Sequence, residues 1–103
     1  MGEEKSFQYL KKIKDLADRR AIPLAAVIFP FEKRGHVYAY ASLHEKIHST
    51  LDNMSVPYVD LFEALNSNTN KDIWIERRHP NEKGHEIASL VLFRFLEPII
   101  EKQ

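Results

Sequence analysis

The chain has 103 residues, with 15 basic and 15 acidic side chains and a formal net charge of zero. This balanced charge excludes a general electrostatic attraction for nucleic acid or an anionic membrane, so either would need a local patch. The 44% hydrophobic content predicts a single globular domain over residues 1–103. The absence of cysteine excludes disulfides, zinc–thiolate centres and a thiol nucleophile. No apolar run approaches the roughly 20 residues of a membrane span, so neither nucleic-acid binding nor a span is expected.

The first two elements predicted are a helix and a buried strand. Apolar residues recur every three or four positions from Ser6 to Arg19, which predicts an amphipathic helix. An uninterrupted apolar run follows over residues 24–29 and is stopped by Pro30. A run this short is typical of a strand covered on both faces, as in a parallel sheet.

The middle of the chain repeats this order. An apolar stripe at helical spacing over residues 37–51 predicts a second helix. Residues 56–62 are rich in β-branched and aromatic side chains and predict a second parallel strand. A helical turn is expected at 63–65, and the Asn/Ser-rich segment 66–70 favours a loop.

The last predicted element is a helix over residues 82–100. Its apolar positions leave only a narrow polar strip, so this helix is expected to be largely buried. Asn81 is a good N-cap because its side-chain oxygen can accept from a free N–H of the first turn. Pro98 is expected to bend or end the helix.

This alternation of helices and strands predicts an α/β fold with right-handed crossovers on a parallel sheet. Two strands and three main helices correspond to about half of a doubly wound, three-layer α/β/α domain. An edge of such a small sheet lacks a neighbouring strand, so a homodimer formed through the exposed sheet edge is expected.

The segment with the clearest chemistry runs over residues 73–88. Glu76 and His79 lie in it, just ahead of the N-terminus of the last helix. Loops of this kind collect catalytic groups in open α/β sheets. A histidine three residues after a carboxylate can have one ring nitrogen held by that carboxylate while the other faces a hydroxyl.

The order Glu76-x-x-His79-Pro80-Asn81-x-x-Gly84-His85, after a strand ending at residue 62, resembles the C-terminal block of SGNH (GDSL-type) hydrolases. The strand at 24–29 is similar to the preceding β-α unit of that fold. The resemblance covers nearly the whole chain, but only residues 76–84 are specific. It implies a flavodoxin-like three-layer fold and a small acyl or acetyl ester substrate. It also implies that His79 is the general base of a catalytic triad and that Glu76 orients it.

The sequence departs from the family pattern in two ways. Glu76 stands where the family has an aspartate, and its side chain is one methylene longer. No Gly-Asp-Ser occurs, and the blocks that supply the nucleophile and part of the oxyanion hole have no counterpart. The resemblance therefore implies a C-terminal half domain that lacks a nucleophile and is inactive alone, the serine block preceding residue 1.

Other interpretations of the same residues remain open. Glu76 can instead be a solvated acid paired with Arg77 or Arg78, in which case Asp72 is the alternative partner of His79. A second function is a non-enzymatic α/β module that self-associates through its sheet edge. A third is a metal-dependent hydrolase using His79, His85 and Glu76, but their spacing matches no helical ligand pair, so no metal or other cofactor is expected.

Two further pairs have both a structural and a functional interpretation. His44 and His48 are four residues apart beside an apolar stripe, where packed interface histidines are commoner than metal ligands. Trp74 and Phe31 can line an acyl pocket, but aromatic side chains beside a helix usually fill a core.

Overall fold

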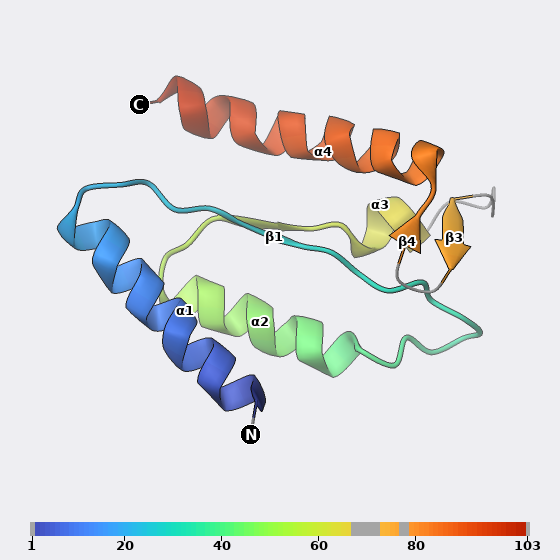
Figure 1. Cartoon of the computed structure of the whole chain (residues 1–103), viewed down its shortest axis with the longest axis horizontal. Coiled ribbons are helices and arrows are strands. Elements are labelled where there is room, and N and C mark those ends of the chain that lie inside the picture. Colours follow the sequence, from blue (N-terminus) through green and yellow to red (C-terminus); the bar gives the residue numbers. More distant parts are fainter. Residues whose placement is uncertain (1, 67–72, 77–78, 103) are drawn as a thin grey trace. The chain divides into compact units, whose positions relative to one another are not determined.

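The structure of the chain is a computed structural model that describes residues 2–66, 73–76 and 79–102 (Figure 1). It confirms a mixed α/β protein, with four helices and two small two-stranded sheets within these ranges. In chain order the elements are α1 (Gly2–Arg19), β1 (Ala26–Ile28), α2 (Ala41–Asn53), β2 (Tyr58–Asp60), α3 (Phe62–Asn66), β3 (Trp74–Glu76), β4 (His79–Pro80) and α4 (Glu82–Glu101).

The first sheet pairs the two predicted strands, β1 and β2. The Ala26 N–H donates to Pro57 O at 3.0 Å, and the Leu61 N–H donates to Ile28 O at 2.9 Å. Both bonds advance in the same direction along the chain, which is the pattern of a parallel pair. The second sheet pairs β3 with β4 in antiparallel fashion. Glu76 and His79 are expected from the sequence to lie in a loop, so their places on β3 and β4 correct that prediction.

The chain divides into two compact units, each described here by itself. The first comprises Met1–Ala26 and Ser42–Tyr58, and the second comprises Val27–Ala41 and Val59–Gln103. The single domain expected from the composition stays a prediction.

In the first unit, α1 and α2 end in the same way. Ala21 and Ser55 adopt left-handed backbone conformations, with φ of 55° and 56°. The next residue in each case donates back into the helix, from Ile22 to Ala17 O and from Val56 to Leu51 O. These are Schellman-type ends, in which a left-handed residue lets the chain satisfy the last carbonyls of the helix. They fix the point where the chain leaves each of these two helices and continues toward the next strand.

The histidines of α2 have packed positions. His44 is buried, with 8% of its surface exposed. The His48 ring stacks on the Tyr58 ring, with centroids 5.0 Å apart and an interplanar angle of 25°. The helix begins at Ala41 rather than near Val37, which is 78% exposed.

The core of the second unit lies where α3, the β3–β4 hairpin and the first turns of α4 meet. Four residues in it are at most 3% exposed: Leu61, Leu65, Ile73 and Ala88. Val59, Trp74, Ile87 and Val91 pack against them. This core holds the hairpin against α4, and the predicted site residues lie on that hairpin.

Two burial predictions are wrong in this structure. The helix α4 is not largely buried, since Leu90, Phe93 and Ile100 are 49%, 60% and 63% exposed. Ile87, Ala88 and Val91, in the N-terminal half of α4, belong to the core of the second unit. Pro98 lies inside the helix, which continues to Glu101. Val27 on β1 and Phe29 just after it are 41% and 51% exposed, because a short two-stranded sheet leaves part of each strand uncovered.

Candidate functional site

The two predicted catalytic residues lie opposite each other on the β3–β4 hairpin. Trp74 pairs with Pro80 and Glu76 pairs with His79, so β3 carries one residue more than β4 between the two pairs. This extra residue is Ile75, and it forms the irregularity of a β-bulge. In a regular antiparallel register Glu76 would face position 78. The bulge therefore brings Glu76 and His79 together.

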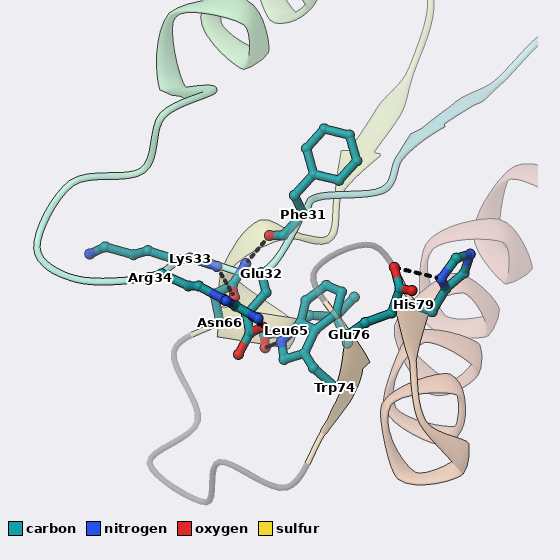
Figure 2. Close-up of polar contacts among 9 residues, drawn as sticks. All are labelled: Phe31, Glu32, Lys33, Arg34, Leu65, Asn66, Trp74, Glu76 and His79. Carbon is teal, nitrogen blue, oxygen red and sulfur yellow. Dashed lines mark hydrogen bonds and ion pairs between the residues drawn. The ribbon is translucent and has the colours of Figure 1, made fainter.

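The two side chains are in contact (Figure 2). His79 Nδ1 lies 3.0 Å from Glu76 Oε1, which is hydrogen-bonding distance. The side chains of His79 and Glu76 are 67% and 58% exposed, so the pair itself adds little to stability. In a neutral imidazole, a carboxylate beside Nδ1 favours the tautomer in which Nδ1 carries the proton and Nε2 is free to accept one.

Asn81 fixes the position of the hairpin relative to α4. Its Oδ1 accepts from the Gly84 N–H at 2.9 Å, which confirms the predicted N-cap. Its own N–H donates to Ile73 O at 2.6 Å. Ile73 is 2% exposed and immediately precedes β3. Asn81 thus caps the start of α4 and also bonds to the residue just before β3, the strand that carries Glu76.

Gly84 is a site residue whose role was not predicted from the sequence. A Cβ added there would lie 2.6 Å from Pro80 Cβ, 2.8 Å from Ile73 Cγ2 and 2.8 Å from Ile73 O. The first turn of α4 therefore packs against Ile73 before β3 and Pro80 in β4, so closely that position 84 has no room for a Cβ. A glycine within a helix destabilises the helix by about 1 kcal/mol relative to alanine. A glycine in the first turn of a predicted helix was therefore the one sign in the sequence that this position packs closely against another element.

The C-terminal end of α3 connects the hairpin to residues 29–40, called here the segment after β1 (Figure 2). The Trp74 indole N–H donates to Leu65 O at 3.2 Å. On the next residue, Asn66 Oδ1 accepts from the Lys33 N–H at 2.9 Å, and its Nδ2 donates to Phe31 O at 3.0 Å. Two adjacent residues of α3 thus hold the hairpin and the segment after β1. Trp74 belongs to the core, as the structural interpretation expected, and this bonding was not foreseen.

The segment after β1 is also held by an aromatic cluster. The Phe31 N–H donates to Tyr38 Oη at 3.0 Å, and the Phe31 ring packs on Tyr40 with centroids 4.6 Å apart. The Tyr38 ring lies 4.5 Å from that of Phe62. Burial raises the pKa of the Tyr38 phenol, with Asp60 adding to the rise and the bond from Phe31 opposing it. This segment is therefore an ordered part of the second unit.

The remaining sequence-predicted candidates fall into two groups. Asp72, Arg77 and Arg78 lie outside the described residues. Within residues 2–66, 73–76 and 79–102, no group of three or more His, Cys, Asp or Glu side chains is placed to hold a metal ion. The metal interpretation built on His79, His85 and Glu76 therefore gains no support. No helix in the described part of the chain is long and apolar enough to cross a membrane.

Comparison of the chain with known protein families, with curated proteins and with solved structures gives no match in any of the three.

Proposed function

We propose that this chain supplies the histidine part of the catalytic site of an SGNH-type ester hydrolase, acting on an acyl or acetyl ester. The observation that carries the proposal is the 3.0 Å contact between His79 Nδ1 and Glu76 Oε1. In this role His79 Nε2 accepts the proton of a serine hydroxyl as it attacks the ester carbonyl, and returns it to the leaving alcohol. Glu76 keeps the ring in the tautomer that makes Nε2 basic and stabilises the imidazolium that forms.

The surrounding residues support this role. A general base must be held in place by its own neighbours, because small displacements of a catalytic group cost large factors in rate. His79 is followed by the buried Pro80, and Asn81 and Gly84 fix the next turn to Ile73. The motif His-Pro-Asn-x-x-Gly thus has a physical meaning here: it packs the start of α4 against the strand that carries Glu76.

The nucleophile is proposed to come from outside the 103 residues, because they contain no Gly-Asp-Ser block. Three exposed apolar side chains are consistent with a larger three-layer flavodoxin-like domain that covers them: Val27 on β1, Phe29 just after β1, and Phe93 on α4. In that arrangement the present chain is the C-terminal half of the domain.

The test has two parts. The purified chain is expected to give no turnover of p-nitrophenyl acetate and no labelling by a fluorophosphonate, and labelling of any of its serines would contradict the proposed external nucleophile. The coding sequence upstream of Met1 is then determined and expressed with the chain. A Gly-Asp-Ser block about 100 residues earlier, an estimate from typical domain sizes, is expected. Esterase activity of that longer protein should fall on the order of 10³-fold or more in His79→Ala. Unchanged activity would refute the role of His79.

A second candidate function is a non-enzymatic module that self-associates through β1. It is favoured by the same exposed residues, Val27 and Phe29, and by the edge of β1 opposite β2. An unpaired strand edge with apolar side chains can add a strand from another copy. Light scattering decides this: a dimer dissociated by Val27→Lys, a charge placed on the edge strand, supports it. A monomer at micromolar concentration excludes it.

A further inference from the structure

The helix α1 exposes an apolar stripe that its own unit does not cover. Phe7 and Leu10 point toward α2 and line an apolar hollow of about 360 Å³ together with Leu43 and Ile47. Tyr9, Ile13 and Leu16 lie elsewhere on the helix and are 60%, 52% and 49% exposed. Their spacing of four and three residues places them on one face. A helix with an apolar face this exposed requires an explanation.

A row of cations runs beside this stripe. Lys5, Lys12 and Arg19 are spaced by seven residues, so they form a line along the helix, and all three are exposed. The Lys12 Nζ lies over the Tyr9 ring, 5.0 Å from its centroid, which shows that the two rows are adjacent. In the part of the chain that the structure describes, none of these three cations forms an ion pair.

Asp15 and Asp18, two of the acidic residues of this helix, lie away from the stripe. Asp18 pairs with Lys14 at 2.7 Å, on the opposite side of the helix from Leu16. Asp15 follows Lys12 by three residues and precedes Arg19 by four, which places it beyond the row of cations. The protein as a whole has no net charge, yet this one face of α1 is both apolar and positive.

We propose that α1 is an interfacial helix that adsorbs to an anionic lipid surface through Tyr9, Ile13 and Leu16. A bilayer with anionic headgroups matches both rows at once: its acyl boundary takes the apolar side chains, and its headgroups take Lys5, Lys12 and Arg19. Tyrosine is also favoured at this depth, because its ring is apolar and its hydroxyl is polar. This proposal does not depend on the proposed hydrolase function.

The test is flotation of the full chain with vesicles of phosphatidylcholine, with and without about 30% phosphatidylserine. Binding is expected to the anionic vesicles, about tenfold or more weaker to the neutral ones, and reduced in about 0.5 M NaCl, where surface charges are screened. Each cation near the surface contributes roughly fivefold, so the Lys5→Gln/Lys12→Gln/Arg19→Gln variant should bind on the order of 100-fold less tightly. The matched control Lys33→Gln/Lys83→Gln/Lys102→Gln removes three exposed charges elsewhere and should bind like the wild type.

A second pair of variants tests the apolar stripe. Ile13→Ser/Leu16→Ser should abolish flotation, whereas Val37→Ser/Ile100→Ser, which changes two exposed apolar residues elsewhere, should not. All of these positions are exposed, so unchanged circular dichroism is expected for every variant. The proposal is overturned if anionic vesicles bind no protein, or if the two charge variants bind equally well. It is also overturned if light scattering finds a dimer that Ile13→Ser/Leu16→Ser dissociates, since a second copy then covers the stripe.

Discussion

The Asn81 N–H donates to Ile73 O at 2.6 Å, so the residue that caps α4 is bonded to the residue that precedes β3. This bond joins the residue before β3 to the residue after β4, so it holds together the open end of the hairpin that carries Glu76 and His79. The geometry of the proposed dyad therefore depends on residues that do not contact it, and several predictions about them can be tested on the isolated chain.

Gly84→Ala is expected to destabilise the chain by about 1–3 kcal/mol, the usual cost of overpacking a tight contact. Alanine is the better helix former, but its Cβ would meet Ile73 O and Pro80 Cβ at less than 3 Å. The measurement is the free energy of unfolding in urea. Lys83→Ala, an exposed change in the same helical turn, should stay within about 0.5 kcal/mol of the wild type. Equal stability of the two variants would show that the turn moves freely away from the hairpin.

Glu76→Ala is expected to change the tautomer of neutral His79. A carboxylate 3.0 Å from Nδ1 favours the tautomer with the proton on Nδ1, and the variant removes that preference. Two-bond ¹H–¹⁵N correlation spectra distinguish the two tautomers directly. His36, which is exposed and outside the hairpin, should give the same pattern in both proteins. An unchanged His79 pattern would mean that Glu76 does not orient the ring.

Asn66→Ala is expected to loosen the segment after β1. The Lys33 N–H loses its acceptor, and a hydrogen bond worth about 1 kcal/mol corresponds to roughly fivefold faster amide exchange at that position. Hydrogen exchange followed by NMR measures it. Asn66→Asp keeps an oxygen acceptor for Lys33 but loses the donor to Phe31 O, so it should protect the Lys33 amide better than alanine does. If both variants exchange like the wild type, the segment is held by its aromatic contacts alone.

The contribution of Tyr38 to stability is expected to depend on pH. Burial raises the phenol pKa in the folded chain above its ordinary value of 10.0, so the folded state keeps the proton to higher pH than the unfolded chain does. The resulting stabilisation is present below pH 10.0 and is lost as the pH rises above it.

Urea unfolding at about pH 9 and about pH 11 tests this expectation. The stability difference between the wild type and Tyr38→Phe should become less favourable to the wild type at the higher pH. Tyr9→Phe, at a 60% exposed position, serves as the control. A Tyr38→Phe difference that is the same at both pH values would contradict the role of burial.

The elements that the sequence predicts well are those whose own pattern is long enough to show a period. Both long helices at the ends of the chain and the Asn81 cap could be predicted for this reason. The strands β1 and β2 could be predicted from the longer apolar and β-branched runs that contain them. The hairpin could not, because its strands of three and two residues lie in no run of that length. Ile73, Trp74 and Gly84 position it instead, and such tertiary contacts leave no periodic signal.

Burial was the least predictable property, since it depends on the neighbours of an element. Val27 and Phe29 belong to a run that suits a covered strand, yet in this structure β1 has β2 as its paired strand and both side chains remain exposed. The apolar pattern of α4 likewise shows only how much of its surface is apolar. It does not indicate what covers Phe93. For the site, the spacing of Glu76 and His79 allowed their pairing as one of two alternatives, whereas it gave no sign of the bulge at Ile75.

That bulge makes the encounter of Glu76 and His79 depend on the number of residues in the hairpin as well as on their identity. Side chains alternate between the two faces of a strand, so inserting or deleting a single residue within 75–78 would move one partner away from the other. A related protein could thus lose its dyad through a one-codon insertion or deletion while retaining both residues. Conversely, Glu and His at a different separation in an otherwise similar chain would not imply the same chemistry.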